Sequence, residues 1–263
     1  MRTPTGGPGT ASETTAPSAG SHNSAQLSKC PPTGKSAAVI MAGGYGTRLF
    51  PITSVIPKVL LPVGESSVLE LILRQLDAAG PLDVHLLLGE KAELIESYAR
   101  HVTHSFENLH LYYHHGTSDC GSAGPLCVMP KGYQSWLVIN GDVRFDFDIG
   151  QLLSSHSRSG ADLTVCSAPY SVSIPYGVVA SDPEGRVSAL EEKPCFSYDV
   201  SAGINVLGPR AQKHIKQHSD MPDVISSCLA SGLNVQSFRI PASWIDIGTI
   251  QSLAEANSKG RHQ

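Results

Sequence analysis

The sequence has no excess of basic residues and no long apolar run, and each absence excludes a class of protein. Lysines and arginines number 19 against 23 aspartates and glutamates, so the formal net charge is -4. A general nucleic-acid binder needs a basic face for its phosphate contacts, so we expect no nucleic-acid partner. No stretch approaches the roughly 20 apolar residues that span a bilayer, so we expect no membrane partner.

Cysteines and histidines show no spacing typical of a metal or disulfide site. The six cysteines, at positions 30, 120, 127, 166, 195 and 228, form no C-x-x-C pair, and no secretory apolar segment precedes them. We therefore predict reduced thiols and a cytoplasmic protein. The histidines at positions 101, 104, 110, 114 and 115 are expected at the surface or in loops, and none is assigned to catalysis.

The composition of the chain changes near Ala37. Residues 1–36 consist mainly of Gly, Pro, Ser, Thr and Ala, whose burial cannot offset the entropy lost on ordering, so we expect a disordered tail. The remaining length is sufficient for one compact domain, which we place at residues 37–258. Residues 259–263 are left as a short second tail.

Short apolar runs alternate with helical patterns in residues 37–258, which predicts βαβ units. The expected fold class is α/β, with a Rossmann-like, mostly parallel twisted sheet flanked by helices. A small antiparallel excursion is expected where residues 176–179 and 186–190 flank a turn that contains Pro and Gly. The expected strands are 37–41, 83–88, 109–113, 136–139 and 162–166, and the expected helices are 67–79, 92–101, 222–231 and 250–257.

A glycine-rich loop follows the first expected strand. Its glycines let backbone N–H groups approach an anion, and Arg48 and Lys58 add a forked guanidinium and a point charge. A lone Gly-Gly-x-Gly is more often a tight turn, but here the pattern extends into charged residues. The spacing matches neither the dinucleotide-binding G-x-G-x-x-G nor the P-loop, so a polyphosphate site of another class is predicted.

Two aspartates stand at positions suited to a metal. Asp142 directly follows an apolar strand, where open α/β sheets place ligands, although a strand-end aspartate can also cap a helix. Asp246 lies in the apolar segment Trp-Ile-Asp-Ile-Gly at 244–248, where an unpaired charge is costly. Two carboxylates together with substrate phosphates suit Mg2+.

The pattern Ala-Gly-Gly-Tyr-Gly-Thr-Arg-Leu-Phe-Pro-Ile-Thr at 42–53, followed by Pro-Lys-Val-Leu-Leu-Pro-Val at 57–63, resembles the signature of the sugar-1-phosphate nucleotidyltransferase family. The resemblance runs from about Ala37 to Ala256 and implies that residues 37–258 are the catalytic domain. It implies transfer of a nucleoside monophosphate to a sugar 1-phosphate, with Mg2+ as cofactor held by Asp142 and Asp246. The nucleotide-binding residues that it implies are Ala42, Gly43, Gly44, Gly46, Thr47, Arg48, Gly121 and Asp142.

Three later segments resemble those that line the sugar phosphate pocket in the family. They are Tyr-Gly-Val-Val at 176–179, Glu-Lys-Pro at 192–194 and Ser-Ala-Gly-Ile-Asn at 201–205. By this resemblance, Glu192 binds sugar hydroxyls and Lys193 binds the sugar phosphate. The implied sugar phosphate-binding residues are Gly177, Glu192, Lys193, Ser201 and Asn205.

Two of these positions depart from the family pattern. Many relatives carry asparagine where this chain has Ser201, and an aromatic residue where it has Asn205. A site that hydrogen-bonds particular hydroxyls rejects analogues strongly, so altered donors and a lost ring imply an altered substrate. We hypothesise a less common sugar phosphate, such as a heptose, octose, amino sugar or cyclitol phosphate.

The implied reaction is attack by a sugar phosphate oxygen on the α-phosphorus of a nucleoside triphosphate, with release of pyrophosphate. A phosphate dianion is already a competent nucleophile, so the protein has to align two anions and neutralise charge. Arg48, Lys58 and Lys193 are the predicted catalytic residues in this role. No covalent intermediate and no general base are required.

The nucleotide base is indicated by residues 121–126, 174–179 and 221–223. These segments resemble the mannose, glucosamine and heptose 1-phosphate guanylyltransferase branch, so GTP is the predicted nucleotide. A uridylyl-, thymidylyl- or cytidylyltransferase is the alternative within the family. An alternative from another class is a regulatory subunit that binds nucleotide sugars without catalysis. A homo-oligomer is left open.

Overall fold

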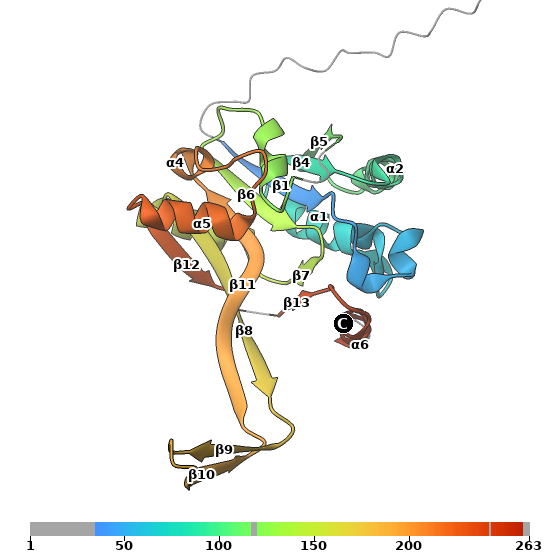
Figure 1. Ribbon diagram of the computed structural model, residues 1–263. Coiled ribbons are helices and arrows are strands. Elements are labelled where there is room, and N and C mark those ends of the chain that lie inside the picture. The colour runs from blue at the N-terminus through green and yellow to red at the C-terminus, as the bar shows by residue number, and fades with distance from the viewer. Residues whose placement is uncertain (1–34, 117–119, 242, 260–263) are drawn as a thin grey trace, which may run out of the picture. The chain divides into compact units, whose positions relative to one another are not determined.

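A seven-stranded sheet lies at the centre of the computed structural model, which describes residues 35–116, 120–241 and 243–259 (Figure 1). Its strands are β1 (Ser36–Ala42), β4 (Leu82–Leu88), β5 (Leu109–His114), β6 (Ser135–Asn140), β8 (Leu163–Ser173), β11 (Cys195–Leu207) and β12 (Val235–Arg239). They follow the order β12-β8-β11-β6-β1-β4-β5, and only β11 runs antiparallel to its neighbours within this sheet. The predicted α/β fold with a mostly parallel sheet is therefore confirmed.

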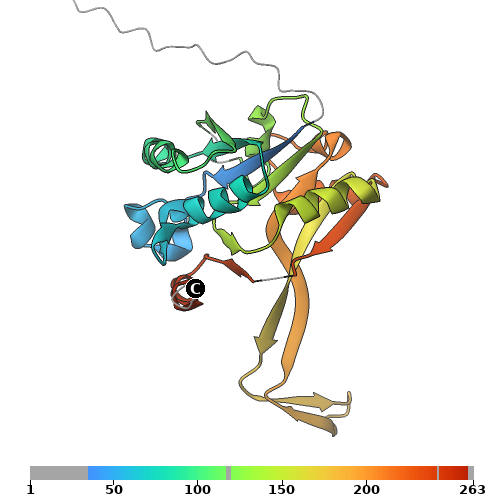
Figure 2. The same ribbon diagram turned by 180° about the vertical axis from the view of Figure 1, so that it is seen from behind.

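Helices cover both faces of this sheet. On one face lie α1 (Val68–Ala78) and α3 (Ile149–Ser159), and on the other lie α4 (Pro209–Gln212) and α5 (Met221–Ala230) (Figures 1 and 2). Alternate residues of β1 enter two separate cores, because Ala38 and Ile40 pack with α1 whereas Ala37 and Val39 pack with α5. A strand that is buried on both faces reads as a continuous apolar run, which explains its pattern in the sequence.

Two further helices complete the described part of the chain, α2 (Ala92–Thr103) and α6 (Ile250–Lys259). None of the helices within the described ranges combines the length and the apolar character that crossing a bilayer requires. Short 3-10 helices are η1 (Thr47–Leu49), η2 (Ile52–Ser54), η3 (Lys58–Leu60) and η4 (Gly124–Val128). Two small strand pairs join β2 (Pro62–Val63) to β3 (Ser66–Ser67) and β7 (Val143–Phe145) to β13 (Trp244–Asp246).

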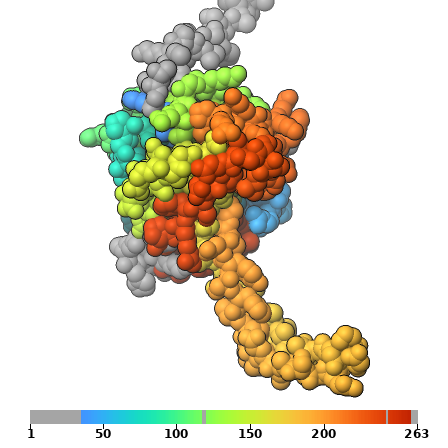
Figure 3. Space-filling view, turned by 90° about the vertical axis from the view of Figure 1, so that its left-hand side faces the viewer, coloured from blue at the N-terminus to red at the C-terminus, as the bar shows by residue number. Residues whose placement is uncertain are grey.

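Strands β8 and β11 continue beyond the sheet as a two-stranded ribbon (Figures 1 and 3). The ladder of this ribbon runs without a break from Ser201 opposite Ser167 to Cys195 opposite Ser173. Its far end carries the antiparallel pair β9 (Gly177–Ser181) and β10 (Val187–Glu192). We call residues 169–199 the arm. The arm contains the antiparallel excursion predicted from the sequence.

The predicted and observed elements differ at several places. β8 extends to Ser173, well past the expected end at 166, and α3 and β12 were not predicted. The α3 segment carries four serines and few apolar residues, so its helical periodicity is weak. The strand β1 begins at Ser36, inside the expected tail of 1–36, and α6 includes Lys259. The rest of both expected tails, 1–34 and 260–263, lies outside the described residues.

A hydrogen-bonded cluster joins β4 to β5, and it corrects the expectation that His114 lies at the surface or in a loop. His114 is the half-buried last residue of β5, and its Nε2 lies 2.8 Å from Nδ1 of His85. Nε2 of His85 lies 3.0 Å from the hydroxyl of Tyr133, which donates to Asp83 at 2.9 Å. Because the Tyr133 hydroxyl gives its proton to Asp83, it accepts from His85. Burial lowers the pKa of both His85 and His114, which favours the neutral form of each ring.

This cluster predicts a loss of stability in acid. Burial, together with a smaller effect of the nearby His114, lowers the pKa of His85 from 6.5 to about 3. The unfolded chain therefore binds a proton below about pH 6.5 that the folded chain does not bind, so the free energy of unfolding falls as pH decreases through this window. Denaturant unfolding between pH 7 and 4 should show a shallower pH dependence in His85→Gln than in the wild type. The exposed His104→Gln is the control and should keep the wild-type slope; equal slopes in all three proteins would contradict the assignment.

Candidate active site

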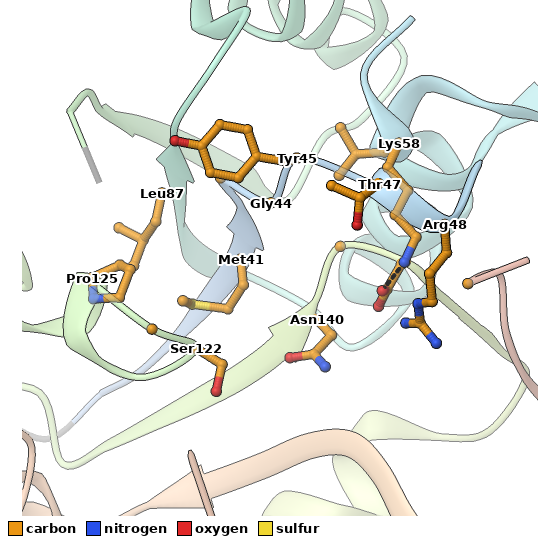
Figure 4. A pocket seen from close by; sticks show the side chains of 17 residues that line it. Met41, Gly44, Tyr45, Thr47, Arg48, Lys58, Leu87, Ser122, Pro125 and Asn140 are labelled. Carbon is orange, nitrogen blue, oxygen red and sulfur yellow. Dashed lines mark hydrogen bonds and ion pairs between the residues drawn. The ribbon is translucent and has the colours of Figure 1, made fainter. Parts of the chain in front are cut away.

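The glycine-rich loop lines a cavity of about 420 Å³ at the carboxyl ends of β1 and β6, which we call the first cavity (Figure 4). Gly46 has a φ of 64°, and an added Cβ would lie 2.8 Å from Cγ2 of Thr53, so the loop conformation requires glycine here. The hydroxyl of Thr53 donates to the carbonyl of Gly46 at 2.8 Å and holds the turn. This edge of an open α/β sheet is where such folds bind ligands.

A lysine and an aspartate pair on one side of the first cavity. Nζ of Lys58, at the start of η3, donates to Oδ2 of Asp142, which follows β6 (Figure 4). Oδ1 of Asp142 is buried and has no hydrogen-bond partner. Arg48 lies beside the pair on η1, so two cations and a carboxylate face the same cavity.

The second predicted metal ligand lies next to the first because of strand pairing. Asp246 on β13 is opposite Val143 on β7, and the N–H of Ile247 donates to the carbonyl of Asp142 at 2.8 Å. Burial raises the pKa of Asp246, and the charge of Asp142 raises it further, while Lys58 and Arg48 act in the opposite direction. Oδ1 of Asp246 is buried and, like Oδ1 of Asp142, has no partner.

These two unpaired carboxylate oxygens fit a divalent cation. Asp142 and Asp246 would hold such a cation, whose positive charge would offset the burial and the repulsion that raise the pKa of Asp246. In the described part of the chain, no group of three or more His, Cys, Asp and Glu side chains is arranged to hold a metal. A two-carboxylate site suits Mg2+, which takes its other ligands from water and substrate phosphates.

Gly248 lies close to the side chains of both Asp246 and Arg48. A Cβ added to Gly248 would lie 2.8 Å from Oδ1 of Asp246 and 3.1 Å from Nη2 of Arg48. Both atoms are the ends of side chains, so a methyl group would displace functional groups and leave the backbone in place. The absence of a side chain here therefore serves the site more than the fold.

Gly248→Ala is expected to lower kcat/KM by roughly 10- to 100-fold, because displaced reactive groups lose their alignment with substrate. The melting temperature should change little, since neither close contact involves backbone. Pyrophosphate release and thermal unfolding, measured on the same preparation, test both parts. A loss of activity that follows a loss of stability would contradict this interpretation and make Gly248 a folding residue.

A second cavity of about 400 Å³ adjoins the first. Asn140 and Ser122 line both cavities. The second cavity is bordered by β11, α5 and β13, and Nε1 of Trp244 donates to the carbonyl of Ala202 at 2.9 Å and joins two of these elements. Gly203, with a φ of 69°, lets the Asn140 side chain approach β11, because an added Cβ would lie 2.7 Å from Nδ2 of Asn140.

The structure brings together most of the residues that the sequence singled out. The first cavity is lined by Gly43, Gly44, Gly46, Thr47, Arg48, Lys58, Gly121 and Asp142. The second is lined by Ser201, Asn205 and Asp246. Ala42 is 4% exposed and packs in the core, so its side chain is not part of either lining. Its expected role in binding nucleotide stays a prediction, and only its backbone could fill that role.

Three predicted residues lie elsewhere. Gly177 begins β9, Glu192 ends β10, and Lys193 follows it, all on the arm and outside both cavities (Figure 1). None of the three lines either cavity, and their expected contact with the sugar phosphate stays a prediction. The reason is the length of β11, whose unbroken ladder separates Lys193 from Ser201.

Sequence reasoning missed several residues that line the cavities. Asn140 stands in the Asn-Gly-Asp segment from which only the aspartate was selected, so a signal was available. Ser122 lies within the segment at 121–126, which the sequence analysis used for the nucleotide base, so a signal was available there too. Met221, Pro222 and Trp244 also line the second cavity. They stand in the segments 221–223 and 244–248, which the sequence analysis used for the nucleotide base and for Asp246 without selecting these three residues.

Comparisons with known proteins agree with this geometry. A family model described as nucleotidyl transferase matches residues 37–263. The UTP--glucose-1-phosphate uridylyltransferase of Synechocystis sp. is 29% identical, over 83% of this chain and 62% of that protein. The mannose-1-phosphate guanylyltransferase catalytic subunit beta of Drosophila pseudoobscura pseudoobscura is 30% identical, over 80% of this chain and 58% of that protein. The chain thus spans less than two thirds of the length of these two relatives.

Two solved structures share the fold. A putative glucose-1-phosphate thymidylyltransferase from Bacillus anthracis has a TM-score of 0.68 at 24% identity, covering 87% of this chain and 96% of that one. HddC from Yersinia pseudotuberculosis, complexed with GMP-PN, has a TM-score of 0.64 at 21% identity, covering 86% of this chain and 99% of that one.

Proposed function

The chain belongs to the nucleotidyl transferase family, and from this premise we propose that it transfers a nucleoside monophosphate from a nucleoside triphosphate to a sugar 1-phosphate, with release of pyrophosphate. The observation that carries the proposal is the pair of adjoining cavities that share Asn140 and Ser122. The first offers glycine backbone and two cations to a triphosphate. The second offers polar side chains of β11 to a sugar. Asp142 lines the first cavity and Asp246 lines the second.

The protein's part in this reaction is positioning and charge neutralisation. Arg48 and Lys58 hold the triphosphate in the first cavity, and the sugar phosphate oxygen approaches the α-phosphorus from the second. The nucleophile is already ionised, so no side chain has to remove a proton. Asp142 and Asp246 are the residues that would hold Mg2+, which supplies positive charge to the phosphate oxygens when bound.

We propose GTP as the nucleotide. Support comes from the segment at 121–126, whose Gly121 and Ser122 line the first cavity, and from curated relatives that are named as guanylyltransferases. The Synechocystis relative, named as a uridylyltransferase, favours UTP as the second candidate. The free thiols of Cys127, Cys166, Cys195 and Cys228 are consistent with a reducing, cytoplasmic setting, which we also propose.

The test is a matrix of nucleoside triphosphates against sugar 1-phosphates, read by pyrophosphate release. Release that requires both substrates and is fastest with GTP supports the full proposal. If release is faster with UTP, UTP replaces GTP as the proposed nucleotide, and the proposed reaction is still supported. Nucleotide binding without release for any sugar phosphate would overturn the reaction in favour of a binding subunit.

The sugar is proposed to be an uncommon one, on the strength of Asn205. This residue is 3% exposed, lines the second cavity, and its Oδ1 has no hydrogen-bond partner. A buried acceptor without a partner is costly, so we infer that a substrate hydroxyl approaches it after local adjustment. Relatives with an aromatic residue here lack this acceptor. If glucose or mannose 1-phosphate proved the best of a broad panel, this part of the proposal would be wrong.

Asn205→Leu is expected to raise KM for the sugar phosphate by roughly 10-fold, because one hydrogen bond to substrate is lost. KM for the nucleotide should not change, since Asn205 does not line the first cavity. The melting temperature should stay the same or rise, because the variant removes an unpaired buried acceptor. Ser226→Ala, at an exposed position of the same lining, is the matched control and should leave both constants unchanged.

A further inference from the structure

Two residues line both cavities, and hydrogen bonds commit the side chain of one of them, Ser122, to the fold. The hydroxyl of Ser122 donates to Oδ1 of Asp220 at 3.0 Å and accepts from the N–H of Met221 at 2.9 Å. Both partners belong to the N-terminus of α5, whose N-cap is Asp220. A hydroxyl has one proton to give, so Ser122 has no side-chain donor left for a ligand.

The other shared residue, Asn140, has a side-chain amide that the fold does not use. Asn140 ends β6, where it pairs with Met41 of β1. Figure 4 shows no hydrogen bond from this amide to the other residues that line the first cavity, and none of the hydrogen bonds found elsewhere in the described ranges involves it. A primary amide has two N–H donors and one acceptor oxygen. All three are available to a ligand or to water.

A glycine on β11 leaves room for this amide. Ile204 of β11 pairs with Ile139 of β6, so Gly203 comes next to Asn140 in the antiparallel register. The atoms nearest to a Cβ added at Gly203 are Nδ2, Cγ and Cβ of Asn140, at 2.7, 3.0 and 3.2 Å. The amide therefore fills the space that a side chain at position 203 would take, beside the residues of β11 that line the second cavity.

The proposed reaction has a use for a donor at the border between the cavities. A triphosphate and a sugar phosphate must approach until an oxygen of one lies roughly 3–3.5 Å from the α-phosphorus of the other. The two N–H groups of one amide nitrogen diverge by about 120°, so hydrogen bonds of 2.9 Å reach two oxygens that are ~5 Å apart. Oxygens on two phosphates at reacting distance have separations of this size. One amide can therefore donate to both phosphates.

We propose that Asn140 contacts both substrates, with one N–H of its amide donating to the α-phosphate of the nucleotide and the other donating to the phosphate of the sugar. The identity of the two ligands rests on the proposed function. The contact aligns the attacking oxygen with the α-phosphorus and adds no charge between the phosphates. Ser122, the other residue shared by the two cavities, cannot replace it, because its hydroxyl donates to Asp220.

The test is whether Asn140→Ala weakens the binding of both substrates. The first probe is the α,β-methylene analogue of GTP or UTP, whichever nucleotide reacts faster, because this analogue cannot release pyrophosphate. The second is the tightest-binding of mannose, glucose, glucosamine and heptose 1-phosphates, titrated by calorimetry into the protein saturated with the analogue.

Both dissociation constants should rise roughly 10-fold in Asn140→Ala, since each ligand loses one hydrogen bond from its charged phosphate. Asn205→Leu should weaken only the sugar phosphate, and Lys58→Met should weaken only the nucleotide, so the two variants calibrate the effect of losing a contact to one ligand. A rise in only one constant for Asn140→Ala, or in neither, overturns the proposal.

A second variant separates contact with the phosphates from a space-filling role. Asn140→Asp keeps the shape of the side chain beside Gly203, but it replaces the N–H donors by a carboxylate that repels phosphate. At constant Mg2+, kcat should fall roughly 10²-fold in Asn140→Ala and further in Asn140→Asp. If Asn140 only fills space, Asn140→Ala is the more damaged variant, and the proposal is wrong.

The outcome for the proposed function is read separately from the wild type. A wild type that binds both probes but releases no pyrophosphate from any nucleoside triphosphate would contradict the proposed function alone. The two dissociation constants of Asn140→Ala would still decide whether Asn140 contacts both ligands.

Discussion

Replacing Asp142 or Asp246 by asparagine is expected to lower turnover by at least ~10²-fold, about 3 kcal/mol of transition-state stabilisation. Each substitution keeps the shape of the side chain and removes one of the two carboxylates whose Oδ1 atoms are buried without partners. The measurement is pyrophosphate release over a titration of Mg2+. The requirement for Mg2+ should rise in both variants, because an amide oxygen binds a divalent cation less strongly than a carboxylate oxygen does.

The two variants should differ in stability. A charged Asp246 is unfavourable in the folded protein, because the side chain is buried and lies near the charge of Asp142. Asp246→Asn should therefore leave the melting temperature unchanged or higher in metal-free buffer. Asp142→Asn removes the ion-pair partner of Lys58 and should lower the melting temperature. The exposed Asp146→Asn is the control for charge removal and should change neither activity nor stability. Near-normal turnover in both active-site variants would remove the basis for the metal site.

Lys58→Met is expected to lower kcat/KM for the nucleotide by roughly 10²- to 10³-fold, the effect of losing one charge that faces the reacting phosphates. It should also lower the free energy of unfolding by about 1–3 kcal/mol, because Asp142 is left largely buried without its partner. The side chains are 12% and 21% exposed, so water reduces the loss below that of a fully buried pair. Steady-state kinetics and denaturant unfolding measure the two effects.

A double variant separates the two roles of Lys58. Lys58→Met combined with Asp142→Asn removes both charges, so most of the lost stability should return. Activity should not return, because neither the phosphate contact nor the metal ligand is restored. Lys131→Met, at an exposed position, is the matched control for loss of a lysine and should behave as the wild type. Recovery of activity in the double variant would show that Lys58 acts only by neutralising Asp142.

The first cavity could be predicted well from the sequence because its residues are close along the chain. The turn at Gly46, the guanidinium of Arg48 and the ammonium of Lys58 follow one strand within a short segment, and local chemistry is sufficient to indicate a phosphate site. The strand alternation likewise predicted the α/β fold. The helix α3 and the strand β12 escaped prediction because their apolar patterns are weak, and packing against the sheet decides them.

The sugar side shows the limit of this reasoning. Resemblance placed Lys193 beside Ser201, yet the ladder of β11 with β8 keeps them apart within one chain. The number of residues between two positions sets only the longest distance between them, and whether that stretch folds back or runs straight depends on its partner strand. The cluster of His85 and His114 was missed for the same reason, since it exists only where β4 and β5 pair in register.

The sequence by itself determined the family, the α/β class and the chemistry of the phosphate loop, because these depend on residue types at short spacing. Only the tertiary structure decided which carboxylates share a site, since the pairing of β7 with β13 brings Asp246 to Asp142. It also decided that the two cavities adjoin, through the pairing of β6 with β11, and that the arm extends away from them. Register between distant strands is set by the burial of whole faces, which no local pattern specifies.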